Sequence, residues 1–172
     1  MKPIKQHYPF LLSALAILLM LIPLGNVKAQ ILELDQKIFG MDCAPCAKGV
    51  EVRMKKMDGV TDAEIDLKKG EARLIFDDAH HTSLKQIQRS IIDGGFSPKD
   101  AQIKVRGMLE KEQDDWHLIT DTDDIFLLKE FDAEQYEIET GREVTIEALI
   151  AERDNQDFWN LTVDQLKATE KS

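Results

Sequence analysis

The feature that most constrains this fold is the order in which two side-chain periodicities follow one another between residues 32 and 105. Apolar and polar residues alternate in three short segments, and less regularly in a fourth at 32–39, as in half-buried strands. In two other segments apolar residues recur every three or four positions, as on one helix face. The strand-like segments are 32–39, 63–67, 72–76 and 101–105, and the helical ones are 47–57 and 84–91. This order predicts an α+β, ferredoxin-like βαββαβ domain, in which both helices cover one face of an antiparallel sheet.

The only two cysteines of the 172-residue chain, Cys43 and Cys46, lie between the first predicted strand and the first predicted helix. Free backbone N–H groups at a helix start favour negative charge, so they lower the pKa of a nearby thiol. Thiolates bind soft metal ions and also attack disulfides, so both kinds of function are open. A disulfide between these residues would close a very short loop and stabilise the fold little, which argues against a purely structural role.

The first 29 residues have the composition of a secretory signal peptide. Lys2 and Lys5 precede an apolar stretch at 9–24, and small residues favour cleavage after Ala29. An uncleaved inner-membrane anchor facing the periplasm is the alternative, although the stretch is shorter than the ~20 residues that usually span a bilayer. We therefore expect a periplasmic protein, which would work in an oxidising compartment.

The chain is strongly acidic. Its formal net charge is −10 at pH 7, and removal of the first 29 residues with their three lysines would leave −13. Acidic proteins bind nucleic acids and anionic membranes poorly, because the phosphate groups of both repel them. We therefore expect no nucleic-acid partner.

Five short motifs lie in the first half of the chain. They are Gly40-Met41-Asp42-Cys43-Ala44-Pro45-Cys46, Asp58-Gly59-Val60, Glu71-Ala72, Phe76-Asp77-Asp78 and Gly94-Gly95-Phe96. Together they resemble the heavy-metal-associated (HMA) domain family over roughly residues 34–106, most of all the periplasmic mercury-binding proteins of bacterial mercury resistance. The resemblance implies a ferredoxin-like fold whose two cysteines hold one thiophilic ion. It also implies transfer of that ion to a membrane metal transporter or another thiol-bearing acceptor.

Cys43 and Cys46 are the metal ligands that we predict. Two thiolates suit ions that accept low coordination numbers, such as Hg(II) or Cu(I), which we favour; Zn(II), which prefers four ligands, and Cd(II) stay open. Asp42 is a candidate third ligand, since similar domains of zinc- and cadmium-exporting ATPases carry Asp here; a solvated loop residue or a helix cap is the alternative. By resemblance, Met41 packs inward beneath the loop, and Phe96 either shields the site or belongs to the core.

His80 and His81 form a pair that could bind a metal ion. In the predicted topology they follow the second hairpin strand, at the end of the sheet opposite the cysteines. We therefore expect both to be ordinary turn residues.

The second half of the chain predicts a small all-β domain. Strand-like segments fall at 105–109, 116–120, 125–128, 143–150 and 160–166, and turn signals such as Thr122-Asp123-Asp124 separate them. An OB-like barrel would leave no strand edge exposed, and Gly107 lies where its first strand would bend. Since neighbouring residues of a strand face opposite sides, we expect Trp116 in the core and His117 at the surface.

These observations predict a division into a signal peptide, two domains and a tail. The ranges are 1–29 for the signal peptide, 30–106 for the HMA-like domain, 107–168 for the β-barrel and 169–172 for the tail.

No catalytic constellation is evident in the sequence, so we expect a monomeric metal carrier and not an enzyme. The alternative is a periplasmic thiol–disulfide oxidoreductase, in which Cys43 attacks and Cys46 resolves; Pro45 between them fits the redox-active Cys-x-Pro-Cys type. A thioredoxin-like fold, however, needs more chain before the motif than one short strand. A third interpretation is an adaptor, in which the acidic barrel docks the carrier half on its acceptor.

Overall fold

The computed structural model describes residues 30–122, 124–136, 138–151 and 159–168. The predicted signal peptide and the predicted tail lie outside these residues. Among the helices described, none is long and apolar enough to cross a lipid bilayer.

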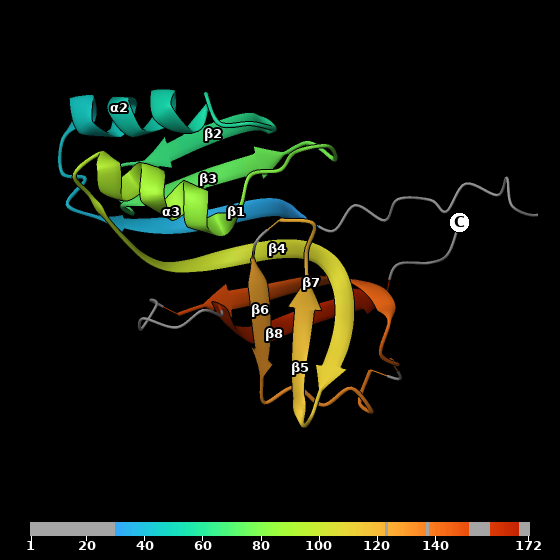
Figure 1. Cartoon of the computed structure of the whole chain (residues 1–172). Helices are drawn as coiled ribbons and strands as arrows, with labels where there is room; N and C mark the ends of the chain where they lie inside the picture. Colours follow the sequence, from blue (N-terminus) through green and yellow to red (C-terminus); the bar gives the residue numbers. More distant parts are fainter. Residues whose placement is uncertain (1–29, 123, 137, 152–158, 169–172) are drawn as a thin grey trace, which may run out of the picture.

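The first half is a four-stranded antiparallel sheet covered by two helices (Figure 1). Its elements are β1 (Ile31–Phe39), α2 (Ala44–Met54), β2 (Val60–Asp66), β3 (Glu71–Phe76), α3 (Leu84–Asp93) and β4 (Ser97–Glu112). The strand order is β2-β3-β1-β4. The predicted ferredoxin-like arrangement is confirmed, and every element except β4 begins and ends within a few residues of its expected position.

Each helix buries one apolar face on this sheet, as the three- and four-residue spacing predicts. The buried helical residues are Ala47, Val50, Met54, Leu84, Ile87 and Ile91. Helix α3 begins with a capping box: Ser83 Oγ accepts from the Gln86 N–H at 3.2 Å, and Gln86 Oε1 accepts from the Ser83 N–H at 2.9 Å. Full burial of an aliphatic side chain contributes about 1.5–3 kcal/mol, so these faces hold the helices in place.

His80 is not the ordinary turn residue that we expected. Its side chain is 3% exposed and stacks on Phe76, with 4.7 Å between ring centroids. Nδ1 accepts a hydrogen bond from the Thr82 N–H at 3.1 Å, which leaves the Nε2 hydrogen to donate to the Ile31 carbonyl at 2.7 Å. Both ring nitrogens therefore form hydrogen bonds, and His80 links the turn before α3 to the start of β1. The start of β1 is the end of the strand opposite the cysteine loop, as predicted.

The second half adds four strands to β4. They are β5 (Asp115–Ile119), β6 (Ile125–Lys129), β7 (Arg142–Ile150) and β8 (Trp159–Ala168). The five strands pair in a closed ring in the order β4-β5-β6-β8-β7-β4, with β6 and β8 parallel and the other pairs antiparallel. The strand-rich second half predicted from the sequence is thus present.

Strand β4 belongs to both halves. Its residues 97–105 pair with β1 and its residues 108–112 with β5, while β7 pairs along the other edge. Every second position from Ala101 to Leu109 is buried, and one continuous core includes side chains of both halves. The two strands predicted at 101–105 and 105–109 are therefore one long, curved strand (Figure 1), and the predicted division at 106/107 falls inside it.

Gly107 allows β5 to pack closely against the bend of β4. A Cβ atom at this position would lie 2.6 Å from the Ile119 carbonyl oxygen and 2.8 Å from Leu118 Cγ. We expect Gly107→Ala to lower the free energy of unfolding by about 1–3 kcal/mol, because strand and core must shift to admit the methyl group. Urea unfolding followed by circular dichroism measures the loss.

Gly49→Ala is the matched control for this substitution. Gly49 lies in α2 with nothing within 4 Å of the position that a Cβ atom would occupy, so the change should leave stability equal or raise it by up to about 1 kcal/mol. If Gly107→Ala unfolds at the same urea concentration as the parent protein, the close approach is not a constraint on the fold.

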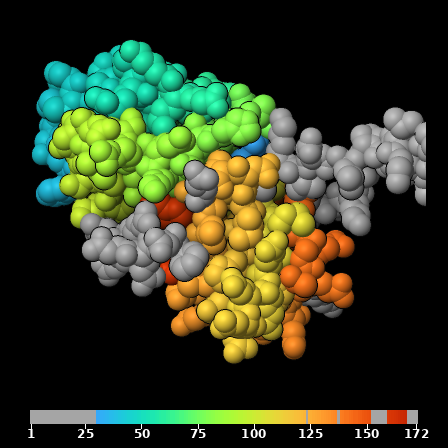
Figure 2. All heavy atoms as spheres, in the orientation of Figure 1, coloured from blue at the N-terminus to red at the C-terminus, as the bar shows by residue number. Residues whose placement is uncertain are grey.

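Asp124 joins the loop between β5 and β6 to the first half. Its carboxylate is 2% exposed and accepts hydrogen bonds from the Leu84 and Lys85 N–H groups at the start of α3. It also accepts from Trp159 Nε1 at 3.1 Å and from Thr122 Oγ1 at 3.4 Å. The sequence indicates a plain turn at 122–124; instead Asp124 holds the yellow-orange surface of the second half against the green surface of α3 (Figure 2).

Trp116 and His117 are both half-buried, which corrects two expectations. The core residue of this part of β5 is Leu118. Trp116 lies instead at one end of the strand ring, edge-on to Phe131 at 6.0 Å between centroids. Its surroundings form a pocket.

Candidate metal centre

The cysteine loop is shaped by the residues that precede it. Gly40 follows β1 with a φ of +90°, a conformation that residues with a Cβ rarely adopt. The next residue, Met41, is buried in the core, as the resemblance implied. The chain then returns to the surface at Asp42 and Cys43, both of which are exposed. A buried anchor followed by two exposed residues therefore presents the first cysteine to solvent.

Cys43 is the N-cap residue of α2, and Cys46 lies in its first turn. The Cys43 backbone is extended (φ −134°, ψ 148°), and its Sγ accepts a hydrogen bond from the Cys46 N–H at 3.1 Å. The Cys43 carbonyl accepts from the Ala47 N–H at 3.0 Å, which starts the helix. Sulfur thus takes the place of the oxygen that usually caps a helix.

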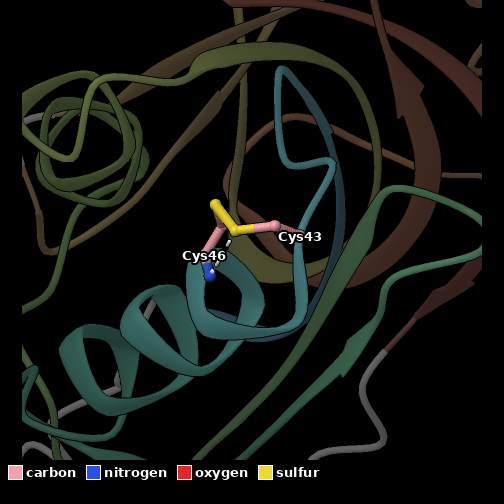
Figure 3. Close-up of a disulfide and its surroundings, with 2 residues drawn as sticks. All are labelled: Cys43 and Cys46. Carbon is pink, nitrogen blue, oxygen red and sulfur yellow. Dashed lines mark hydrogen bonds between the residues drawn. A yellow bond between two sulfur atoms is a disulfide. The ribbon is translucent and has the colours of Figure 1, made fainter.

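The two sulfur atoms are joined as a disulfide, with 5.1 Å between the Cα atoms (Figure 3). Cys43 is exposed, whereas Cys46 is half-buried and packs against the core. The pair is therefore accessible from one side. The sequence left metal binding and redox chemistry open, and the structure describes the oxidised form of this pair.

Two positive features lie near the sulfurs, the N-terminal end of α2 and the side chain of Lys48. Lys48 follows Cys46 closely, but its ammonium group is paired with Glu51 at 2.8 Å, and Lys55 binds the other Glu51 oxygen at 2.8 Å. These hydrogen bonds, that from Lys48 first, lower the pKa of Glu51 to about 2. Besides Lys48, the N-terminal end of α2 supplies positive potential at the sulfurs, because its dipole points there and the Cys46 N–H donates to Cys43 Sγ.

Within the described part of the chain, no group of three or more His, Cys, Asp or Glu side chains is placed to hold a metal ion. Asp42 stays a predicted third ligand that the structure leaves exposed to solvent. Phe96 is half-buried and packs against the core, and its Cδ1 would lie 3.9 Å from a Cβ atom at Gly40. It therefore belongs to the core and lies close to the start of the cysteine loop.

Comparison with known proteins supports the interpretation of residues 40–46 as a metal-binding motif. The model of the heavy-metal-associated domain family matches residues 37–97. The copper chaperone CopZ of Staphylococcus haemolyticus (strain JCSC1435) is 38% identical over 60 residues, which cover 35% of this chain and 87% of that protein. This chain belongs to the heavy-metal-associated domain family.

Other HMA relatives differ in size. The copper-transporting ATPase HMA5 of Oryza sativa subsp. japonica is 36% identical over 75 residues, which cover 42% of this chain and only 7% of the ATPase. Among solved structures, oxidised MerP from Ralstonia metallidurans CH34 is 27% identical, with 41% of this chain and 93% of that chain covered and a TM-score of 0.35. The similarity in all three comparisons is confined to less than half of this chain.

Proposed function

We propose that this protein is a carrier that holds one soft metal ion, with Cu(I) favoured over Hg(II), between the thiolates of Cys43 and Cys46. The observation that carries the proposal is an exposed Cys-x-x-Cys pair at the start of a helix, in a chain of the HMA family. Relatives named as copper chaperones and copper-transporting ATPases favour Cu(I). Two sulfur ligands suit an ion that accepts two-coordination.

Binding requires that the disulfide first be reduced. Two electrons and two protons convert the disulfide to two thiols, and the metal ion then displaces those protons as it binds two thiolates. An exported protein would need a thiol reductant for this step. The oxidation state of the pair therefore controls whether the carrier can load.

Transfer to an acceptor follows from the unequal exposure of the two sulfurs. An acceptor thiolate adds to the ion from the open side and makes it three-coordinate. The bond to exposed Cys43 is then exchanged first, and the bond to half-buried Cys46 last. Each step exchanges one metal–sulfur bond for another, so no large barrier is expected and no catalytic group is needed.

We further propose a periplasmic location and a thiol-bearing membrane transporter as the acceptor. The location is supported by the composition of residues 1–29. The acceptor is supported by the HMA segments of relatives named as copper-transporting or copper-exporting ATPases. We also propose that the second half of the chain is an OB-like barrel, which is supported by the pairing of strands β4 to β8 in a closed ring.

Competition between ions tests the proposal directly. The reduced chain is mixed with equimolar Cu(I), Hg(II), Zn(II) and Cd(II) in the presence of glutathione and analysed by native mass spectrometry. We expect one Cu(I) or Hg(II) per chain, and none bound by the disulfide form. A reduced chain that releases all four ions to glutathione would refute the carrier function.

An exposed disulfide also fits a thiol–disulfide oxidoreductase, and an insulin-reduction assay separates the two functions. We expect insulin to be reduced no faster than by a free dithiol at the same concentration, because the motif lies at the start of a helix in a ferredoxin-like fold and not in a thioredoxin-like fold. Rapid catalytic reduction of insulin, together with loss of metal uptake, would favour the oxidoreductase.

A further inference from the structure

A concave site is lined by Lys111 and Trp116 of the β4–β5 hairpin and by residues between 131 and 139. The β4–β5 hairpin lies at the end of the strand ring that is remote from the cysteine loop (Figure 1). The site has a volume of about 470 Å³, which is within the range of ordinary ligand pockets. Four of its lining residues are apolar, Trp116, Phe131, Ala133 and Ile138, and we call these the floor; the other four are charged. Nothing in the proposed metal transfer uses these residues.

The aromatic floor is held rigidly in place. Trp116 meets Phe131 edge-on at 6.0 Å, with 81° between the ring planes. Phe131 in turn stacks on Tyr136 at 5.5 Å, with 12° between the planes. Rings fixed by such contacts lose little side-chain freedom when a ligand binds, so the pocket is organised in advance.

One cation already occupies part of this aromatic surface. Lys111 lies directly opposite Trp116 in the β4–β5 pairing, and its Nζ is 5.5 Å from the centroid of the Trp116 ring. This is the distance at which the negative face of an aromatic ring attracts an ammonium group. The face of Trp116 is therefore accessible to an ammonium group.

Three carboxylates, which we call the rim, line the pocket together with the single cation Lys111. Asp132, Glu134 and Glu139 line the pocket and are exposed. Asp132 Oδ1 accepts from the Glu134 N–H at 3.0 Å, which fixes the local turn. Among the ion pairs of the described residues, none includes any of these three carboxylates. The pocket thus combines an apolar aromatic floor with an unbalanced negative rim.

We propose that this pocket is a docking site for a basic, partly apolar peptide segment of a protein partner. An arginine or lysine side chain lies over the Phe131–Trp116 floor with its charge among the rim carboxylates, and a neighbouring apolar side chain covers Ile138. A free polyamine could place its amines at the rim but would cover the floor only with thin methylene segments, and an anionic membrane is repelled by the rim. A peptide with both kinds of side chain matches both parts of the pocket.

Fluorescence anisotropy with the full disulfide-form chain tests this site independently of metal transfer. The probe is a labelled nonapeptide of alternating arginine and leucine, and its control carries glutamate in place of arginine. The pocket variant is Glu134→Lys/Glu139→Lys. The matched control is Glu64→Lys/Asp164→Lys, which changes the net charge equally at two exposed positions outside the pocket.

We expect the arginine peptide to bind the parent protein, the pocket variant to bind it at least about tenfold more weakly, and the matched control to change affinity less than about threefold. Phe131→Leu, which keeps the floor apolar, should also weaken binding. Equal losses in the two double variants would show attraction to net charge alone and overturn the proposal. Displacement of the peptide by spermine at equal charge concentration would assign the pocket to small amines and overturn the peptide assignment.

Discussion

Replacement of either cysteine by alanine should abolish tight binding of a soft metal ion. A metal bound by four protein ligands gains ~10–16 kcal/mol, so a single sulfur is worth several kcal/mol. We expect Cys43→Ala and Cys46→Ala each to lower the affinity of the reduced protein for Cu(I) by at least about 1,000-fold, or roughly 4 kcal/mol. Competition with a chromogenic Cu(I) chelator measures the loss.

Asp42→Asn is the matched control, because it changes the same exposed loop without removing a sulfur. If two thiolates suffice for Cu(I), this variant should keep the parent affinity within about twofold and lose affinity only for Zn(II) or Cd(II), which take more than two ligands and can use a carboxylate oxygen as one of them. A large loss of Cu(I) affinity would make Asp42 a ligand for the soft ion as well. Circular dichroism of each variant shows whether the fold survives loss of the N-cap sulfur.

Asp124→Ala should be among the most destabilising substitutions in the second half. It leaves the Leu84 N–H and the Trp159 indole N–H without their buried acceptor. Each buried donor without a partner costs about 1–3 kcal/mol, so we expect the free energy of unfolding to fall by about 2–5 kcal/mol. Exposed Asp164→Ala is the control and should change stability by less than about 0.5 kcal/mol. Equal urea midpoints for the two variants would contradict the role assigned to Asp124.

The effect of Asp124→Ala should also depend on pH. Burial raises the pKa of Asp124 above its ordinary value, and the hydrogen bonds to its carboxylate offset this only in part. The folded protein then binds the proton more tightly than the unfolded chain does, so protonation stabilises the fold. This stabilisation is present below the ordinary pKa and is lost as the pH rises through the folded pKa. The stability difference between parent and variant should therefore widen as the pH is lowered from 7 towards 4.

The local features of the first half could be predicted from the sequence. Helical spacing predicted helices at 47–57 and 84–91, and Ala47, Val50 and Met54 do lie on one buried face of α2. The motif at 40–46 placed both cysteines correctly at a strand-to-helix junction. These features depend on contacts between residues that are close in the chain, so one stretch of sequence suffices to recognise them.

Features that depend on distant contacts were missed. Asp124 and His80 looked like turn residues, because nothing near them in the sequence reveals that α3 or the start of β1 will lie against them. The predicted domain division fell at Gly107, although the alternation from Ala101 to Leu109 continues through it without a break. That unbroken alternation was the available signal for a single strand.

The continuity of β4 sets a geometric condition on any acceptor that also uses the pocket. Since one strand runs through both units and Asp124 ties α3 to the β5–β6 loop, the separation between the Trp116 pocket and Cys43 is fixed. A partner can therefore engage both places at once only if its own thiols and its basic segment are spaced to match, or if a linker spans the difference. The fold would then select among acceptors by their length as well as by their chemistry.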